Sequence, residues 1–171
     1  MRVLEEAEAV MDIKLAAAIV LHPDPSGQDR VLVVRRSEEE TFLPRRWGVP
    51  CGKVEDSEEP RDAAVRELRE ETGLAGKVVR AVGTLEFRSQ WRGKSARNIQ
   101  SNYLMRLKHA HTDTDSDGMP LIRTPQIDQD SKWLTLNEIG QAGLDEHNLQ
   151  AIRQALAGHG MEANSALARR G

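Results

Sequence analysis

Two apolar segments near the N-terminus constrain the fold of this chain more than any other feature. Residues 13–21 are almost continuously apolar, and a second apolar run covers residues 31–34. A segment rich in Pro, Asp and Gly, residues 22–27, separates the two runs. This pattern is typical of two strands joined by a turn, and it predicts that the first strand is central and buried. Because the first run is rich in alanine, a helix over residues 13–21 is the alternative.

The length of 171 residues fits a single domain with a short segment at each end. The formal net charge of -3 argues against a nucleic-acid partner, since nucleic-acid-binding domains are usually basic. The single cysteine cannot form an internal disulfide. No run approaches the roughly 18 apolar residues of a membrane span, and acids near the N-terminus do not fit a secretory signal. We therefore expect a cytoplasmic protein without a membrane partner.

The rest of the chain predicts further strands around one well-defined helix. That helix is expected to begin at Pro60, because proline suits a first helical turn, and to end at Gly73, a frequent C-terminal cap. The other expected elements are strands over residues 77–87, 98–107 and 131–136 and helices over residues 137–142 and 145–157. Residues 1–11 form a lead-in, 109–130 a polar loop and 158–171 a loose tail. These elements predict an α/β fold, with a mixed β-sheet sandwiched between α-helices.

The predicted helix carries three acids that project together. Glu67, Glu70 and Glu71 stand at positions i, i+3 and i+4, so their side chains share one face. Such a patch of carboxylates is unfavourable unless cations neutralise it, and Mg²⁺ and Mn²⁺ prefer oxygen ligands of this kind. The alternative interpretation is a solvated helix with ordinary Glu–Arg pairs.

Residues 52–74 decide between these interpretations, because they match the pattern G-x5-E-x7-R-E-U-x-E-E-x-G-U, where U is aliphatic. The matching positions are Gly52, Glu58, Arg66, Glu67, Leu68, Glu70, Glu71, Gly73 and Leu74. The pattern resembles the Nudix box, and the segments around Trp47 and Trp133 also resemble that family. The resemblance covers residues 12–157 and implies the Nudix fold.

The resemblance assigns a role to each position of the box. Glu70 and Glu71 correspond to metal ligands, Glu67 to a further ligand or the general base, and the backbone carbonyl of Cys51 to another ligand. The implied metal is Mg²⁺ or Mn²⁺. Arg66 would orient the carboxylates through Glu58, and Gly52 would allow a tight turn. Gly73, Leu68 and Leu74 would be structural. The family usually has glycine where this chain has Cys51, and we interpret that thiol as a buried side chain rather than a nucleophile.

Several residues outside the box have two interpretations. Asp128 and Asp130 are candidates for an additional acid at the site. Arg35, Arg36, Arg45 and Arg46 could contact phosphates or could be charges at strand edges and loops. Trp91 could stack on a nucleobase, although an aromatic side chain at a hairpin tip is the simpler interpretation.

The implied activity is hydrolysis of a diphosphate linkage in a nucleoside diphosphate joined to another group, X. A nucleoside triphosphate, canonical or oxidised, is the first expected substrate, because signatures of other family substrates are not evident. The expected partner is therefore a small nucleotide, and a homodimer is compatible with the family. The alternative is a non-catalytic Nudix module that senses or binds a nucleotide, although such relatives usually have a degraded box.

Overall fold

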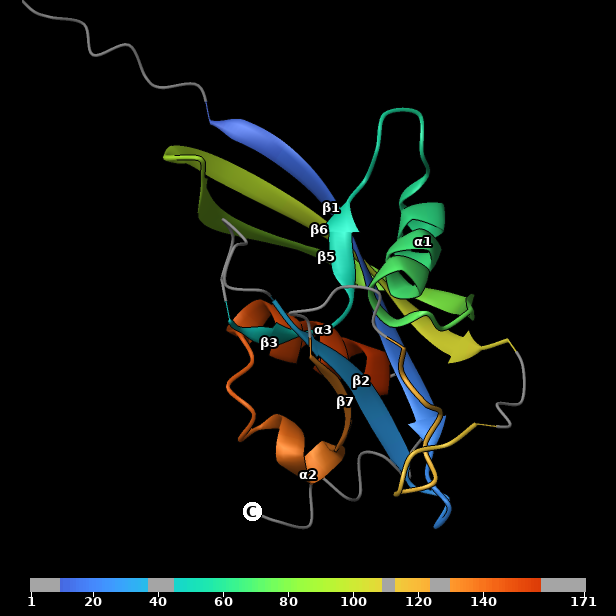
Figure 1. Ribbon diagram of the computed structural model, residues 1–171. Coiled ribbons are helices and arrows are strands. Elements are labelled where there is room, and N and C mark those ends of the chain that lie inside the picture. The colour runs from blue at the N-terminus through green and yellow to red at the C-terminus, as the bar shows by residue number, and fades with distance from the viewer. Residues whose placement is uncertain (1–9, 37–44, 109–112, 124–129, 158–171) are drawn as a thin grey trace, which may run out of the picture.

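The computed structural model describes residues 10–36, 45–108, 113–123 and 130–157 (Figure 1). Its strands are β1 (Met11–Pro23), β2 (Asp29–Arg35), β3 (Trp47–Gly48), β4 (Cys51–Lys53), β5 (Gly76–Trp91), β6 (Lys94–Leu107) and β7 (Ser131–Thr135). Its helices are α1 (Pro60–Thr72), α2 (Leu136–Ile139) and α3 (Glu146–Ala157). Among these described residues, no helix is long and apolar enough to cross a bilayer.

β1 lies at the centre of a mixed sheet with the strand order β3-β2-β1-β6-β5. It runs parallel to β6, with Met11 paired to Ala96 and Val20 paired to Met105. On its other edge it pairs antiparallel with β4 and then with β2. β7 pairs with β2 off this path. The strand interpretation of residues 13–21 is therefore confirmed, and the helix alternative is wrong for this segment.

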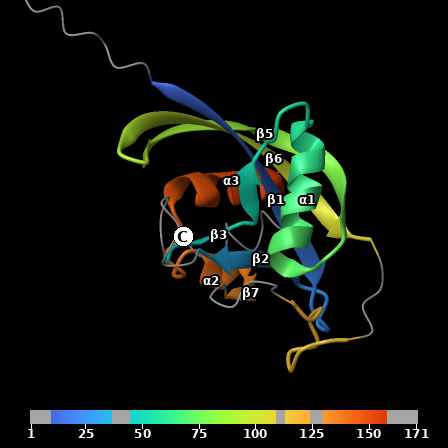
Figure 2. The ribbon, with the colours of Figure 1, turned by 45° about the horizontal axis from the view of Figure 1, so that its top comes forward.

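The two faces of β1 contribute to two separate hydrophobic cores. Ala16, Ala18 and Val20 pack with Leu68 of α1. The alternating residues, including Ile19, pack with Ile152 of α3. Figure 2 shows α1 and α3 on either side of β4 and β1. Because side chains alternate along a strand, a strand that is covered on both faces must be apolar throughout. The predicted sheet between helices is confirmed.

β5 and β6 are longer than the strands expected from the sequence. They form one hairpin whose turn, Arg92-Gly93, has positive φ at both residues, 49° and 75°. Two positive φ values suit a two-residue hairpin turn that matches the twist of the strands. Trp91 lies next to this turn, as the hairpin-tip interpretation predicts.

α2 is shorter than the expected helix over residues 137–142. It begins after Thr135, whose hydroxyl accepts a hydrogen bond from the Glu138 N–H, while the Glu138 side chain accepts one from the Thr135 N–H. Gly140 and Gly143 follow, and glycine is unfavourable inside a helix. The capping box therefore begins a helix that the glycines end after one turn.

Candidate active site

α1 carries the acidic box, and its two ends fix its position. Pro60 occupies the first turn, where its missing N–H costs no hydrogen bond. Gly73 ends the helix in the left-handed conformation and donates its N–H to the carbonyl of Arg69. A β carbon on Gly73 would lie 2.9 Å from the Arg123 carbonyl oxygen, so the tight packing also requires glycine. Leu68 and Leu74 are buried. The structural role predicted for these residues agrees with their positions.

Arg66 binds the acids of the box together. Its Nε and Nη2 atoms donate to the two carboxylate oxygens of Glu58, at 2.8 and 2.9 Å. Its Nη1 atom donates to Glu67 at 2.8 Å and to Glu70 at 3.2 Å. Nη2 also donates to the Lys53 carbonyl at 2.9 Å, which ties α1 to the end of β4. A planar guanidinium suits this task because it offers five donors in a fixed geometry.

The charges in this network shift the pKa values of its members. The hydrogen bonds from Arg66 hold the pKa of the Glu58 carboxyl at about 2, below its ordinary value of 4.5. The bond with Glu58 also raises the pKa of Arg66. Burial raises the pKa of Glu67, and the bond from Arg66 opposes that change. Arg66 is therefore a permanent cation and Glu58 is ionised. The Glu67 carboxyl lies in a partly desolvated environment.

Gly52 makes room for Glu67. A β carbon at this position would lie 2.1 Å from the Glu67 Cδ atom, which is far closer than any real contact. Gly52 lies within β4 and does not have positive φ. The tight turn expected at this glycine is therefore wrong, because the position is a strand residue in close contact with a carboxylate.

Cys51 precedes that glycine and pairs with Ala17 of β1. Its φ is not positive, so a side chain at this position introduces no backbone strain. The side chain is buried, and its Sγ atom lies 3.6 Å from Oε1 of Gln100. The interpretation as a buried thiol is confirmed.

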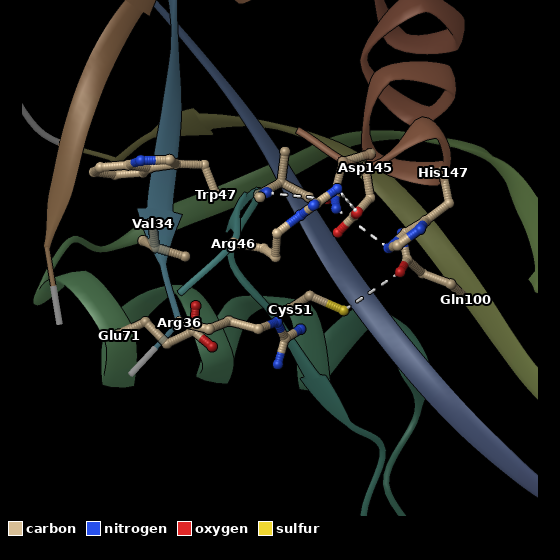
Figure 3. A pocket seen from close by; sticks show the side chains of 12 residues that line it. Val34, Arg36, Arg46, Trp47, Cys51, Glu71, Gln100, Asp145 and His147 are labelled. Atoms are coloured by element: carbon tan, nitrogen blue, oxygen red, sulfur yellow. Dashed lines mark hydrogen bonds and ion pairs between the residues drawn. The ribbon is translucent and has the colours of Figure 1, made fainter. Parts of the chain in front are cut away.

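A small inner cavity connects α1 to the start of α3 (Figure 3). Its volume of about 10 Å³ has room for roughly one water molecule. In Figure 3, Glu71 and Arg36 lie on one side, and Asp145 and His147 lie on the other. Glu71 is half-buried, with its Oε2 atom shielded from solvent. The polar lining comprises Arg36, Arg46, Glu71, Gln100, Asp145, His147 and Asn148.

The arginines singled out in the sequence occupy different positions. Arg46 lines the inner cavity and forms an ion pair with Asp145. Arg36 also lines the cavity, and its N–H donates to the Arg46 carbonyl at 3.0 Å. Arg45 has a positive φ of 63° and donates its N–H back to the Arg36 carbonyl. Arg35 lies over the Trp47 ring, 5.7 Å from its centroid. Two of the four arginines, Arg36 and Arg46, therefore line the inner cavity.

Asp130 and Trp91 do not line this cavity. Asp130 forms an ion pair with Arg35, and its carbonyl accepts a hydrogen bond from the Arg35 N–H at 2.8 Å. Asp128 lies outside the described residues. The Lys53 ammonium lies 3.6 Å from the centroid of the Trp91 ring. One face of Trp91 is therefore covered by a lysine, and the role of Asp130 as an additional acid stays a prediction.

Sequence reasoning missed the residues that α3 and β6 contribute. Asn148 accepts a hydrogen bond from the Val49 N–H at 3.1 Å, and a β carbon on Gly48 would lie 2.9 Å from its Nδ2 atom. His147 stacks on Phe87, with ring centroids 4.0 Å apart. Burial lowers the pKa of His147, although Asp145 opposes this change. These residues are far from the box in the sequence. The nearest segment that the sequence analysis singled out is Trp47-Gly48-Val49, whose Val49 N–H donates to Asn148.

The donor set of α1 fits a magnesium or manganese ion. Among the described residues, no three His, Cys, Asp or Glu side chains form a ready metal cage. Mg²⁺ seldom uses such a cage, since it keeps several waters and binds one or two carboxylates together with substrate phosphates. Glu67, Glu70 and Glu71 of α1 offer hard oxygen ligands, and Glu71 also lines the inner cavity. The chemistry of the residues therefore agrees with this metal.

Comparison with known proteins finds relatives of similar sequence and structures of the same fold. Over 59 residues, which are 34% of each protein, the chain is 48% identical to diphosphoinositol polyphosphate phosphohydrolase 3-alpha of Homo sapiens. The chain thus matches about a third of the length of that relative. The structure resembles a MutT protein from Methanosarcina mazei Go1, with a TM-score of 0.64 at 20% identity over 86% of this chain and 94% of the other.

A second similar structure is the NUDIX domain of Shewanella oneidensis NrtR, which was solved with ADP ribose. Its TM-score is 0.63 at 21% identity, over 84% of this chain and 86% of the other. These two structures share the fold. The family model of the NUDIX domain matches residues 13–155, which is most of the chain. The resemblance seen in the sequence is therefore confirmed, and the chain belongs to the NUDIX domain family.

Proposed function

We propose that this protein is a Nudix hydrolase that cleaves a diphosphate linkage in a nucleoside diphosphate joined to another group. The observation that carries this proposal is the complete acidic face of α1, with Arg66 bonded at once to Glu58, Glu67 and Glu70. A helix that needed only solubility would not gather several carboxylates around one arginine. The phosphohydrolase named among the relatives supports the same reaction class.

In this proposal Glu70, Glu71, Glu67 and the Cys51 carbonyl would hold the metal, which is Mg²⁺ or Mn²⁺. When bound, such an ion neutralises phosphate charge and lowers the pKa of a coordinated water. Glu67 is the proposed general base, because its partly desolvated carboxylate favours proton acceptance. Arg66 keeps Glu67 in place, and Glu58 keeps Arg66 in place. The products are a nucleotide and phosphate, pyrophosphate or the phosphorylated group X.

Arg36 and Arg46, which line the inner cavity, would contact the substrate phosphates. Arginine suits this task because its fork can bind two phosphate oxygens at once. We propose a nucleoside triphosphate, canonical or oxidised, as the substrate, in a domain over residues 12–157. A cytoplasmic location and a homodimer stay predictions, and so does the absence of a nucleic-acid partner.

The test is metal-dependent hydrolysis by the wild-type protein and by Glu71→Gln. The panel includes nucleoside triphosphates, oxidised dGTP, ADP-ribose, dinucleoside polyphosphates, sugar nucleotides and a diphosphoinositol polyphosphate. We expect turnover of one class that Glu71→Gln reduces by about 10³-fold or more. Glu59→Gln is the matched control, because Glu59 is exposed at the start of the same helix and makes no capping bond. A wild-type protein that binds nucleotide and metal without turnover would favour the sensor alternative.

A further inference from the structure

Val49 and Pro50 join β3 to β4, and we call these two residues the β3–β4 link. Pro50 has no N–H, and its carbonyl accepts a hydrogen bond from the Ala18 N–H of β1 at 2.9 Å. Val49 is buried, and its N–H donates to Oδ1 of Asn148 on α3 at 3.1 Å. The link is therefore hydrogen-bonded to the sheet on one side and to a side-chain amide of α3 on the other.

The bond from Val49 fixes the orientation of the Asn148 amide. The amide oxygen faces the Val49 N–H, so the NH₂ group faces the other way, and Nδ2 lies 3.2 Å from Nε2 of His147. An amide nitrogen only donates, so Nε2 of His147 accepts. A β carbon on Gly48 would lie 2.9 Å from Nδ2 and 3.1 Å from Oδ1, so the amide has little room to move. His147 is therefore neutral in this arrangement, with its proton on Nδ1.

A second contact holds the His147 ring in the same place. The ring stacks on Phe87, with the centroids 4.0 Å apart and an interplanar angle of 12°. Aromatic faces attract cations, so this stack tolerates a protonated ring as well as a neutral one. Protonation adds an N–H at Nε2, which then points at the NH₂ group of Asn148. The two groups can pair again only if the amide flips, and a flipped amide presents its NH₂ group to the Val49 N–H.

We propose that Asn148 and His147 form a proton-sensitive latch, which holds the β3–β4 link against α3 while His147 is neutral and releases it when His147 is protonated. The released link keeps its bond from Ala18, and it leads directly into Cys51. Because the Cys51 carbonyl is a proposed metal ligand, the latch would make the geometry of the site depend on pH. The latch itself is a property of the fold, and it does not rest on the proposed function.

The charged groups around His147 act in both directions. Burial lowers the pKa of His147 below its ordinary value of 6.5, Asp145 raises it, and Arg36 lowers it again. Figure 3 shows Asp145 and His147 together at the start of α3. Among the described residues, the other charged groups that line the inner cavity, or the adjoining space between β5 and the start of α3, are Arg46, Glu71, Glu86, Arg88 and Glu146. The neutral His147 contributes stability above pH 6.5 that is lost as the pH falls below this value, because the unfolded chain takes up the proton more readily.

Amide hydrogen exchange of Val49, measured by NMR from about pH 8 to about pH 5, tests the latch over the range in which histidine titrates. The protection factor corrects each exchange rate for the intrinsic effect of pH, and long-range proton–nitrogen spectra report which ring nitrogen of His147 carries the proton. His147→Phe keeps an aromatic ring on Phe87 but cannot take up a proton. His22→Phe is the matched control, since His22 lies against Trp133, with ring centroids 5.8 Å apart, and does not line the inner cavity.

At the upper end of this pH range we expect Nε2 of His147 to carry no proton and the Val49 N–H to be protected. As His147 takes up its second proton, the protection factor of Val49 should fall by about tenfold or more in the wild type and in His22→Phe, and it should stay constant in His147→Phe. Asn148→Asp should reverse this response, because both oxygens of a carboxylate accept hydrogen bonds. In that variant the pKa of His147 should rise, and the Val49 N–H should stay protected as His147 becomes protonated.

The opposite results overturn the latch. Protonation of His147 that leaves the protection of Val49 unchanged overturns it, and so does a loss of protection that is equal in His147→Phe or in Asn148→Asp. A proton on Nε2 at neutral pH also overturns it, as does an imidazole that stays neutral until the protein unfolds. These measurements use no substrate and no metal, so their outcome is independent of the hydrolysis assay on Glu71→Gln.

Discussion

The carboxylate of Glu67 occupies the space in which residue 52 would carry a side chain. A β carbon on Gly52 would lie 2.1 Å from Glu67 Cδ and 2.2 Å from Oε1. The same carboxylate accepts a hydrogen bond from Arg66 at 2.8 Å. Strand β4 and helix α1 are therefore as close as a glycine permits, and this contact holds the proposed base in one position.

Gly52→Ala should displace Glu67 and impair turnover more than it impairs folding. The added methyl group must move the carboxylate, because a strand backbone paired with β1 cannot retreat. We expect a loss of about 10²-fold in turnover and of about 1–3 kcal/mol in the free energy of unfolding. Gly140→Ala is the control, since nothing lies within 4 Å of a β carbon there. Activity that survives Gly52→Ala would contradict the position assigned to Glu67.

The fold was largely predictable because its strongest signals are local. Successive side chains of the apolar run over residues 13–21 can enter two different cores only if the run is a strand that is covered on both faces. Pro60 and Gly73 mark the ends of α1 by their backbone preferences alone. The acids of α1 were predictable for the same reason, since Glu67, Glu70 and Glu71 share a helix face whatever the rest of the chain does.

The far side of the site was not predictable, because tertiary contacts create it. Asn98, Gln100 and Asn102 of β6 are polar, so alternation suggests that they face solvent. All three are buried on the α3 side of the sheet, where Gln100 lines the inner cavity and donates to Asn102 at 2.7 Å. Likewise, the pairing of Asp145 with Arg46 joins residues 99 positions apart. No local pattern indicates such partners.

Glu58→Gln should destabilise the protein in a pH-dependent way. The pKa of Glu58 is about 2 in the folded protein, below its ordinary value of 4.5, because Arg66 binds it. A depressed pKa contributes stability above the unfolded pKa and loses it as the pH falls through the folded pKa. The difference in unfolding free energy between wild type and Glu58→Gln should therefore be largest near neutral pH and shrink from about pH 4.5 toward about pH 2.

Urea unfolding at a series of pH values measures this difference. The matched comparison is the same substitution in an Arg66→Met background, where the largest cause of the shift is absent. In that background the pH dependence assigned to Glu58 should shrink to the smaller part that the hydrogen bond from the Glu55 N–H contributes. An equal pH dependence in both backgrounds would show that Arg66 is not its source.

Asp145→Asn should strengthen the binding of an anionic substrate. Asp145 now pairs with Arg46 at the inner cavity, so its carboxylate competes with phosphate for the same guanidinium. We expect KM to fall by about two- to tenfold with little change in kcat, and we expect Arg46→Met to raise KM. Asp12→Asn is the control, because its pair with Arg97 is exposed on the early part of β1. A KM unchanged in both Asp145→Asn and Arg46→Met would exclude Arg46 from phosphate binding.

Gly48 and Asn148 should be coupled, since their contact fixes the start of α3 against the segment before β4. Gly48→Ala alone places a methyl group 2.9 Å from the Asn148 amide, at a cost of about 1–3 kcal/mol. Asn148→Ala alone leaves the buried Val49 N–H without its acceptor, at a similar cost of about 1–3 kcal/mol. The double variant avoids the clash with the Asn148 amide but still leaves the Val49 N–H without its acceptor. Urea unfolding should therefore show a loss of unfolding free energy that is smaller than the sum of the two single losses by about 0.5–3 kcal/mol. Strict additivity would mean that α3 shifts freely, and Asp145 and His147 would then not be held in place at the inner cavity.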